Sequence, residues 1–198
     1  MTFAFGGASI DGSAYTDVVD LAGRSPSWVD TAVAAWSAYG LAVFALLMVL
    51  GWWQARRTGA VTALAAPVAV VLAYGVDAAL KLVVREDRPC RNLRVRTLEA
   101  CPAPGDWSFP SNHSAIAAAT AVALVFVSRR LGAVAAVAAL AMAASRAWVG
   151  VHYPHDVAVG VLVGVLVASA AMILLRRWAR TLARHLSATV LRPLLAAP

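Results

Sequence analysis

The sequence contains few charged residues, a single lysine and only two cysteines. Charged residues make up 14% of the 198 positions and the mean hydropathy is +0.73, whereas soluble domains are about one quarter charged. A water-soluble core of one domain could not hide this much apolar surface, so we expect the lipid bilayer to be the solvent. The length suits one domain.

The N-terminus lacks the features of a secretory signal. No basic residue precedes Arg24, and no apolar core of the usual length appears in residues 1–27. This segment carries three aspartates, Asp11, Asp17 and Asp20. We expect it to form a short helix at the membrane interface, with a disordered tail as the alternative.

Long apolar runs follow. A membrane-spanning helix needs about 20 mostly apolar residues, and backbone groups in lipid must be satisfied within the helix. Five runs meet or approach that length: 28–53, 60–80, 112–128, 131–149 and 156–175. The sequence therefore predicts an all-α polytopic membrane helical bundle of about five transmembrane helices plus an N-terminal interfacial segment. The predicted domains are 1–27 (interfacial segment), 28–178 (membrane domain) and 179–198 (basic cytoplasmic tail).

The basic residues lie at the ends of the apolar runs. Membrane proteins use them in this way, so we expect no nucleic-acid partner despite a net charge of +7. One predicted side carries nine arginines and no acid, and the other carries eight basic residues and all ten acids. If three of those eight basic residues have a chemical role, the first side is the cytoplasmic one. The acidic side also holds both cysteines, Cys90 and Cys101, which would form a disulfide in an oxidising compartment or remain free thiols.

Three polar clusters interrupt the apolar pattern. "KLVVREDRP" ends the second run, "FPSNH" begins the third, and "SRAWVGVHYPHD" joins the fourth to the fifth. Two spans separate the last cluster from the second, and none separates the second from the first. All three clusters therefore emerge at one membrane surface, whichever surface that is.

The residue types in these clusters suit phosphate chemistry. Lys81, Arg88 and Arg146 supply three cations, and guanidinium groups match phosphate oxygens well. The sequence Pro-Ser-Asn before a helix offers unpaired backbone N–H groups and a favourable helix dipole. His152 lies four residues before Asp156, whose carboxylate would fix the imidazole tautomer and leave the other nitrogen as a nucleophile.

Simpler interpretations exist for single residues. Charged residues at span ends often serve only as anchors, and Asp77 could pair with Lys81 at i,i+4. His155 receives no role, and His185 is expected to be solvated. Gly160 and Gly164 either form a close-packing helix face or reflect composition alone. Anchoring requires neither histidine nor aspartate, which favours a functional interpretation of the three clusters together.

The pattern Lys-x6-Arg-Pro, Pro-Ser-x-His and Ser-Arg-x5-His-x3-Asp resembles the type 2 phosphatidic acid phosphatase superfamily over about residues 60–175. The resemblance implies a helical bundle that removes phosphate from a lipid without metal or other cofactor. It implies His152 as the nucleophile that forms a phosphohistidine, Asp156 as its partner and His113 as general acid. The implied phosphate-binding residues are Lys81, Arg88, Ser111, Asn112 and Arg146. Many members have glycine where this chain has Asn112, and asparagine tolerates unusual backbone angles better than most residues.

Small size, few spans and a polar residue at position 112 resemble the bacitracin-resistance-type undecaprenyl-pyrophosphate phosphatases. The resemblance implies hydrolysis of undecaprenyl (polyprenyl) diphosphate to the monophosphate, which recycles the cell-wall carrier lipid. A phosphatidylglycerophosphate or phosphatidic acid phosphatase and, in another class, a non-catalytic membrane transporter are the alternatives. We expect a multi-pass plasma (inner) membrane protein with an extracytoplasmic site and a cytoplasmic C-terminus. Its partners would be the lipid substrate and membrane lipids, and a homo-oligomer is left open.

Overall fold

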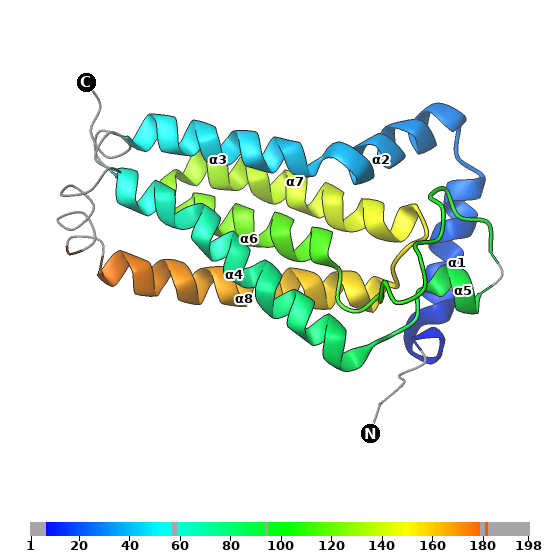
Figure 1. Cartoon of the computed structure of the whole chain (residues 1–198). Helices are drawn as coiled ribbons and strands as arrows, with labels where there is room; N and C mark the ends of the chain where they lie inside the picture. The colour runs from blue at the N-terminus through cyan, green and yellow to red at the C-terminus, as the bar shows by residue number, and fades with distance from the viewer. Residues whose placement is uncertain (1–6, 57–58, 94, 179–180, 182–198) are drawn as a thin grey trace.

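The structure, a computed structural model, describes residues 7–56, 59–93, 95–178 and 181, and this part of the chain contains helices and no strands. Figure 1 shows α3, α4, α6, α7 and α8 running along one another as a bundle, with α1 and α5 at one end of it. The all-α prediction is confirmed. The helices are α1 (Ala8–Gly23), α2 (Ser27–Tyr39), α3 (Leu41–Ala55), α4 (Ala60–Val84), α5 (Pro89–Asn92), α6 (Asn112–Val127), α7 (Arg129–Trp148) and α8 (Pro154–Arg177).

Helices α4, α7 and α8 are long and apolar enough to cross a membrane. The predicted run 28–53 is instead two helices, α2 and α3, bent by 54°, which pass the same test as a pair. The break lies at Gly40, where a Cβ atom would meet the carbonyl oxygen of Trp36 at 2.4 Å. Helix α6 has only 16 residues. The described chain therefore holds three candidate spans, or four with the bent pair, and the count of about five remains a prediction.

Small residues allow α6 to lie at the centre of the bundle. Ala115, Ala119 and Ala123 on α6 have no exposed surface. On α8, a Cβ at Gly160 would lie 2.5 Å from the carbonyl oxygen of Ser111, and one at Gly164 would lie 2.3 Å from that of Ala115. Close approach of backbones, which only glycine allows here, thus fixes α8 against the start of α6.

The described part of the N-terminal segment is helical rather than a disordered tail. Helix α1 packs against the ends of α7 and α8, and the fully buried ring of Tyr15 lies 5.4 Å from that of Tyr153. The hydroxyl of Tyr15 donates to the carbonyl of Gly150 at 2.9 Å. Whether α1 lies at a membrane interface stays a prediction. The predicted tail 179–198, with His185, lies outside the described residues apart from 181.

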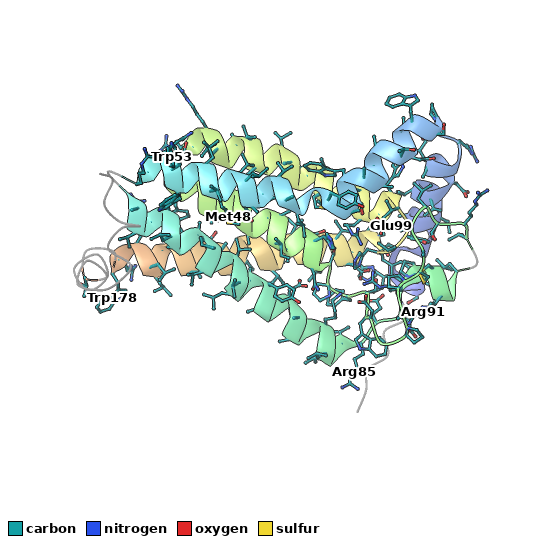
Figure 2. The ribbon with its side chains drawn as sticks, turned by 45° about the horizontal axis from the view of Figure 1, so that its top comes forward. Met48, Trp53, Arg85, Arg91, Glu99 and Trp178 are labelled. Carbon is teal, nitrogen blue, oxygen red and sulfur yellow. A yellow bond between two sulfur atoms is a disulfide. The ribbon has the colours of Figure 1, made fainter. Side chains whose placement is uncertain are left out.

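The two ends of the bundle differ in chemistry. Figure 2 shows Arg85, Arg91 and Glu99 at the end that carries α1 and α5, and Trp53 and Trp178 at the opposite end. A disulfide joins Cys90 of α5 to Cys101 in the loop before α6, with Cα atoms 5.9 Å apart.

Candidate active site

His152 lies in the short turn between α7 and α8. Gly150 adopts a left-handed conformation (φ +86°) that reverses the chain, and Pro154 begins α8, where its missing N–H costs nothing. The turn is tightly buried, because Val149 and Val151 have no exposed surface and His152 has 2%. Local sequence thus holds the imidazole at the start of a helix, inside the protein.

The neighbours of His152 fix its tautomer. Nη1 of Arg88 lies 3.2 Å from Nε2 of His152. A guanidinium group only donates hydrogen bonds, so Nε2 must be the acceptor and the ring proton must be on Nδ1. Nδ1 lies 3.4 Å from Oδ2 of Asp156. The lone pair of Nε2 therefore faces the cationic side of the site, as a nucleophile requires.

Asp156 is fully buried and organises the surrounding loops. Its Oδ2 accepts from the backbone N–H of Tyr153 at 2.8 Å and from the hydroxyl of Ser108. Its backbone carbonyl accepts from the N–H of Ser111 at 3.1 Å. Asp156 consequently joins the start of α8 to the loop before α6, two of the predicted clusters.

Arg88 and Lys81 come from the first cluster; Arg88 contacts the third cluster, and both contact the loop before α6. Arg88 donates to the carbonyl of Val151 at 2.9 Å and forms an ion pair of 2.9 Å with Asp106. Nζ of Lys81 donates to the carbonyl of Trp107 at 2.7 Å. The suggested pairing of Lys81 with Asp77 is not found, since neither carboxylate oxygen of Asp77 has a hydrogen-bond partner in the described chain.

The second cluster presents the start of α6. Ser111 is the N-cap residue, but its side chain makes no capping hydrogen bond, and its hydroxyl accepts from that of Ser114 at 3.1 Å. The buried Oδ1 of Asn112 has no partner among the described residues. The charged neighbours of His113 are Arg146, Arg88 and Lys81. Three cations therefore act on the imidazole of His113.

Arg146 occupies the side of the site nearest α2. Its Nη1 contacts the hydroxyl of Ser37 and lies 3.6 Å from Oε2 of Glu99, while its buried Nε has no hydrogen-bond partner in the described chain. A cavity of about 620 Å³ opens beside it. Arg146, His113 and Glu99 line its polar part, and α2 contributes mainly small side chains.

The electrostatics favour an uncharged His152. Burial lowers the pKa of His152 to about 3; the hydrogen bond to Asp156 opposes this shift and the charge of Arg88 adds to it. At Asp106, burial acts to raise the pKa, but the hydrogen bond and charge of Arg88 outweigh it, and the pKa is lowered. At neutral pH the site therefore holds a neutral imidazole beside fixed cations.

The predicted site residues whose contacts are described above lie together at one end of the bundle. The structure also adds residues that the sequence analysis missed. Ser108 and Asp106 belong to the loop before α6, and nothing in their sequence spacing marks them. Glu86 and His155 carried a weak signal, since each lies within two residues of a predicted site residue. Within the described chain, Glu86, His155 and Asp156 form one group whose ligand atoms lie within 4.8 Å of one another, a spacing that a metal ion could use.

Comparison with known proteins agrees with this geometry. Residues 62–180, more than half of the chain, match the PAP2 superfamily, and the chain belongs to that family of lipid phosphatases.

Two relatives carry more specific names. Undecaprenyl-diphosphatase BcrC of Bacillus subtilis is 29% identical over 141 residues, which cover 71% of this chain and 72% of that protein. Decaprenylphosphoryl-5-phosphoribose phosphatase of Mycobacterium tuberculosis is 34% identical over 131 residues, 66% of this chain and 68% of that protein. The crystal structure of LpxE from Aquifex aeolicus has a similar fold, with a TM-score of 0.66, 23% identity, and coverage of 87% of this chain and 99% of that one.

Proposed function

We propose that this protein hydrolyses a polyprenyl diphosphate to the monophosphate through a phosphohistidine on His152. The observation that carries the proposal is the tautomer of His152. Nδ1 faces Asp156 at 3.4 Å, and Nε2 presents its lone pair to the guanidinium of Arg88. A phosphoryl group bound by that guanidinium would meet the nucleophile directly.

The first step transfers the terminal phosphoryl group. Nε2 of His152 forms a bond to phosphorus while the bond from phosphorus to the bridging oxygen breaks. The negative charge of the bound diphosphate offsets the neighbouring cations and allows His113 to carry a proton, which His113 gives to the leaving oxygen. Nδ1–H of His152 keeps its contact with Asp156, which stabilises the positive ring. Lys81, Arg88 and Arg146 neutralise the phosphoryl oxygens, and the unpaired Nε of Arg146 is a donor for one of them.

The second step releases phosphate. Water attacks the phosphohistidine, the Nε2–phosphorus bond breaks, and His113, now neutral, accepts the proton of the water. His152 returns to its starting tautomer and inorganic phosphate leaves. Backbone N–H groups at Ser111 and Asn112 would bind the phosphoryl group throughout.

A polyprenyl diphosphate fits two features. The relative BcrC is named as an undecaprenyl-diphosphatase, and the cavity beside Arg146 continues from the site along α2, whose Ala34, Ala35 and Ala38 offer an apolar wall for an isoprenoid chain. The second relative, named for a phosphoribose lipid, makes that lipid phosphate a competing substrate. Phosphatidylglycerophosphate and phosphatidic acid remain further candidates.

The proposed setting is the plasma membrane, with the site on the extracytoplasmic side and the C-terminus in the cytoplasm. The bridge between Cys90 and Cys101, at the same end as the site, suits an oxidising compartment. Thiol labelling of intact cells before and after reduction tests this orientation.

The activity test uses purified protein in detergent with EDTA. We expect phosphate release from farnesyl diphosphate, a short soluble polyprenyl diphosphate, because the three cations replace a metal. His152→Ala should reduce the rate at least 1,000-fold, as loss of a nucleophile does. Complete dependence on added metal would refute the metal-independent chemistry. A panel with long polyprenyl diphosphate, phosphoribose lipid, phosphatidylglycerophosphate and phosphatidic acid ranks the substrates.

The same assay addresses the transporter alternative. A transporter has no reason to release phosphate in detergent micelles, where no gradient exists. Turnover in micelles therefore favours the enzyme, and its absence with every lipid of the panel would favour transport.

A further inference from the structure

His155 lies three residues after His152, at an unspecified position of the third motif. Both of its ring nitrogens and its ring face have partners. Nδ1 lies 2.8 Å from Oδ1 of Asp11, and Nε2 lies 3.1 Å from Oε2 of Glu86. The ring also stacks on Tyr153, with centroids 5.4 Å apart and planes 17° apart. A side chain with partners on both ring nitrogens and on its ring face, next to the candidate active site, is a candidate for a functional role.

Both ring nitrogens of His155 face carboxylate oxygens. A carboxylate only accepts hydrogen bonds, and a neutral imidazole has a single N–H. Two simultaneous donations need the doubly protonated ring, so His155 is a cation held between Asp11 and Glu86. Glu86 is 2% exposed, and burial of its charge is tolerable because that cation accompanies it.

A local break in the helical conformation of α1 places Asp11 next to His155. The helical dihedral angles are interrupted at Asp11 (φ −145°, ψ 31°). Oδ2 of Asp11 also accepts from the backbone N–H of His155 at 2.7 Å. That N–H belongs to the first turn of α8, where backbone donors lack partners within the helix. Asp11 thus caps α8 from another helix through Oδ2 and contacts the imidazole of His155 through Oδ1.

Asp156 lies between the two histidines. Its Oδ2 faces Nδ1 of His152 at 3.4 Å, and its Oδ1 lies 3.3 Å from Nε2 of His155. Oδ1 of Asp156 has no hydrogen-bond partner in the described chain. Its contact with Nε2 of His155 is the closest contact with a charged group that the structure gives for this oxygen. The carboxylate that orients His152 is therefore held on its other side by the cation at His155.

We propose that His155, oriented by Asp11 and Glu86, is a positioning residue that acts through Asp156 on His152. The cation keeps the carboxylate of Asp156 ionised and directed at Nδ1 of His152, so that Nε2 remains the nucleophile. Helix α1, which lies outside the region matching the family, becomes part of the catalytic framework through Asp11. The inference rests on the proposed role of His152 as nucleophile.

The test compares single turnovers of four variants in detergent, with farnesyl diphosphate carrying a radiolabelled terminal phosphate. The variants are His155→Phe, His155→Gln, Asp11→Asn and the matched control Asp17→Asn, an exposed carboxylate on the same helix. The amplitude of phosphoenzyme formation measures the folded, active fraction, and its rate measures the attack by His152. A structural defect lowers the amplitude, and a positioning defect lowers the rate.

We expect His155→Phe to slow phosphoenzyme formation about 10- to 100-fold, because the buried carboxylate of Asp156 loses the cation that lies 3.3 Å from its Oδ1. KM should stay within about twofold because no phosphate contact is lost. The amide N–H of His155→Gln should restore part of the rate. Asp11→Asn should be slower than Asp17→Asn, and combining it with His155→Phe should add little.

Three results would overturn the inference. An unchanged rate in His155→Phe, with His152→Ala inactive, would refute the positioning role and leave the proposed function intact. Activation of the wild type by a divalent cation, lost in His155→Phe, would make Glu86, His155 and Asp156 a metal site instead. Wild-type activity that survives His152→Ala would refute the proposed function and this inference together.

Discussion

Two histidines three residues apart experience opposite surroundings. His152 meets a guanidinium at Nε2, and His155 meets carboxylates at both nitrogens. The first ring must be neutral to accept a hydrogen bond from Arg88, and the second must be charged to satisfy Asp11 and Glu86. Identical side chains thus take different protonation states, and neighbours from other helices decide which.

Asp156 lies between the surroundings of His152 and those of His155. One of its oxygens faces each ring, so negative charge lies between the neutral and the charged imidazole. Asp11 and Glu86 lie on the His155 side. The two carboxylates on the other side, Asp106 and Glu99, each lie within ion-pair distance of an arginine, Arg88 and Arg146 respectively.

After His152→Ala itself, the largest expected effect comes from removing the cation that faces His152. Arg88→Met keeps much of the side-chain volume but loses the contacts with Nε2 of His152 and with the phosphoryl group. We expect kcat/KM to fall about 100- to 1,000-fold, as for loss of a preorganised oxyanion donor. Steady-state phosphate release measures it. Arg85→Met, at an exposed arginine in the same segment, is the control, and an equal loss there would contradict the assignment.

An intermediate effect concerns stability in acid. Burial lowers the pKa of His152 from 6.5 to about 3, so between these pH values the unfolded chain binds a proton that the folded chain does not. Stability should therefore fall below about pH 6.5, by about 1.4 kcal/mol per pH unit from this residue. His152→Asn removes the titration and should lose less stability between pH 6.5 and 5. Thermal unfolding in detergent measures this, and equal losses in both proteins would contradict it.

The smallest effect on the rate is expected at Tyr15, through which α1 contacts the turn between α7 and α8 without reaching a ring nitrogen of His152 or His155. Tyr15→Phe removes the hydrogen bond to the carbonyl of Gly150 and leaves a buried acceptor unsatisfied, which costs about 1 to 3 kcal/mol. The folded protein should retain a single-turnover rate close to that of the wild type. A rate as low as that of Asp11→Asn would mean that α1 acts through its docking as a whole and not through Asp11.

Much of the site could be predicted from sequence because helix counting places distant clusters at one membrane surface. Lys81, Ser111 and His152 end or begin apolar segments, and a bilayer leaves few ways to arrange such segments. The residue types within the clusters then indicated phosphate chemistry, and their spacing carried the resemblance to the family.

The structure departs from the sequence predictions where packing decides the outcome. The run 28–53 looks like one span, but it bends by 54° between α2 and α3, near a glycine that lies against Trp36 and Met142. Lys81 turns to the carbonyls of Trp107 and Ser108 instead of Asp77. Composition cannot reveal these choices, because they depend on contacts with residues that are distant in the chain.

The sequence by itself determined the class of fold, and it predicted the membrane setting and the residues of the proposed phosphate site. These properties follow from hydropathy and from short-range spacing, which are local. Only the tertiary structure decided the tautomer of His152, the charge of His155 and the involvement of Asp11. A protonation state depends on which donors and acceptors face each atom in a buried site, and here those partners come from α1, from the segment after α4 and from the start of α8.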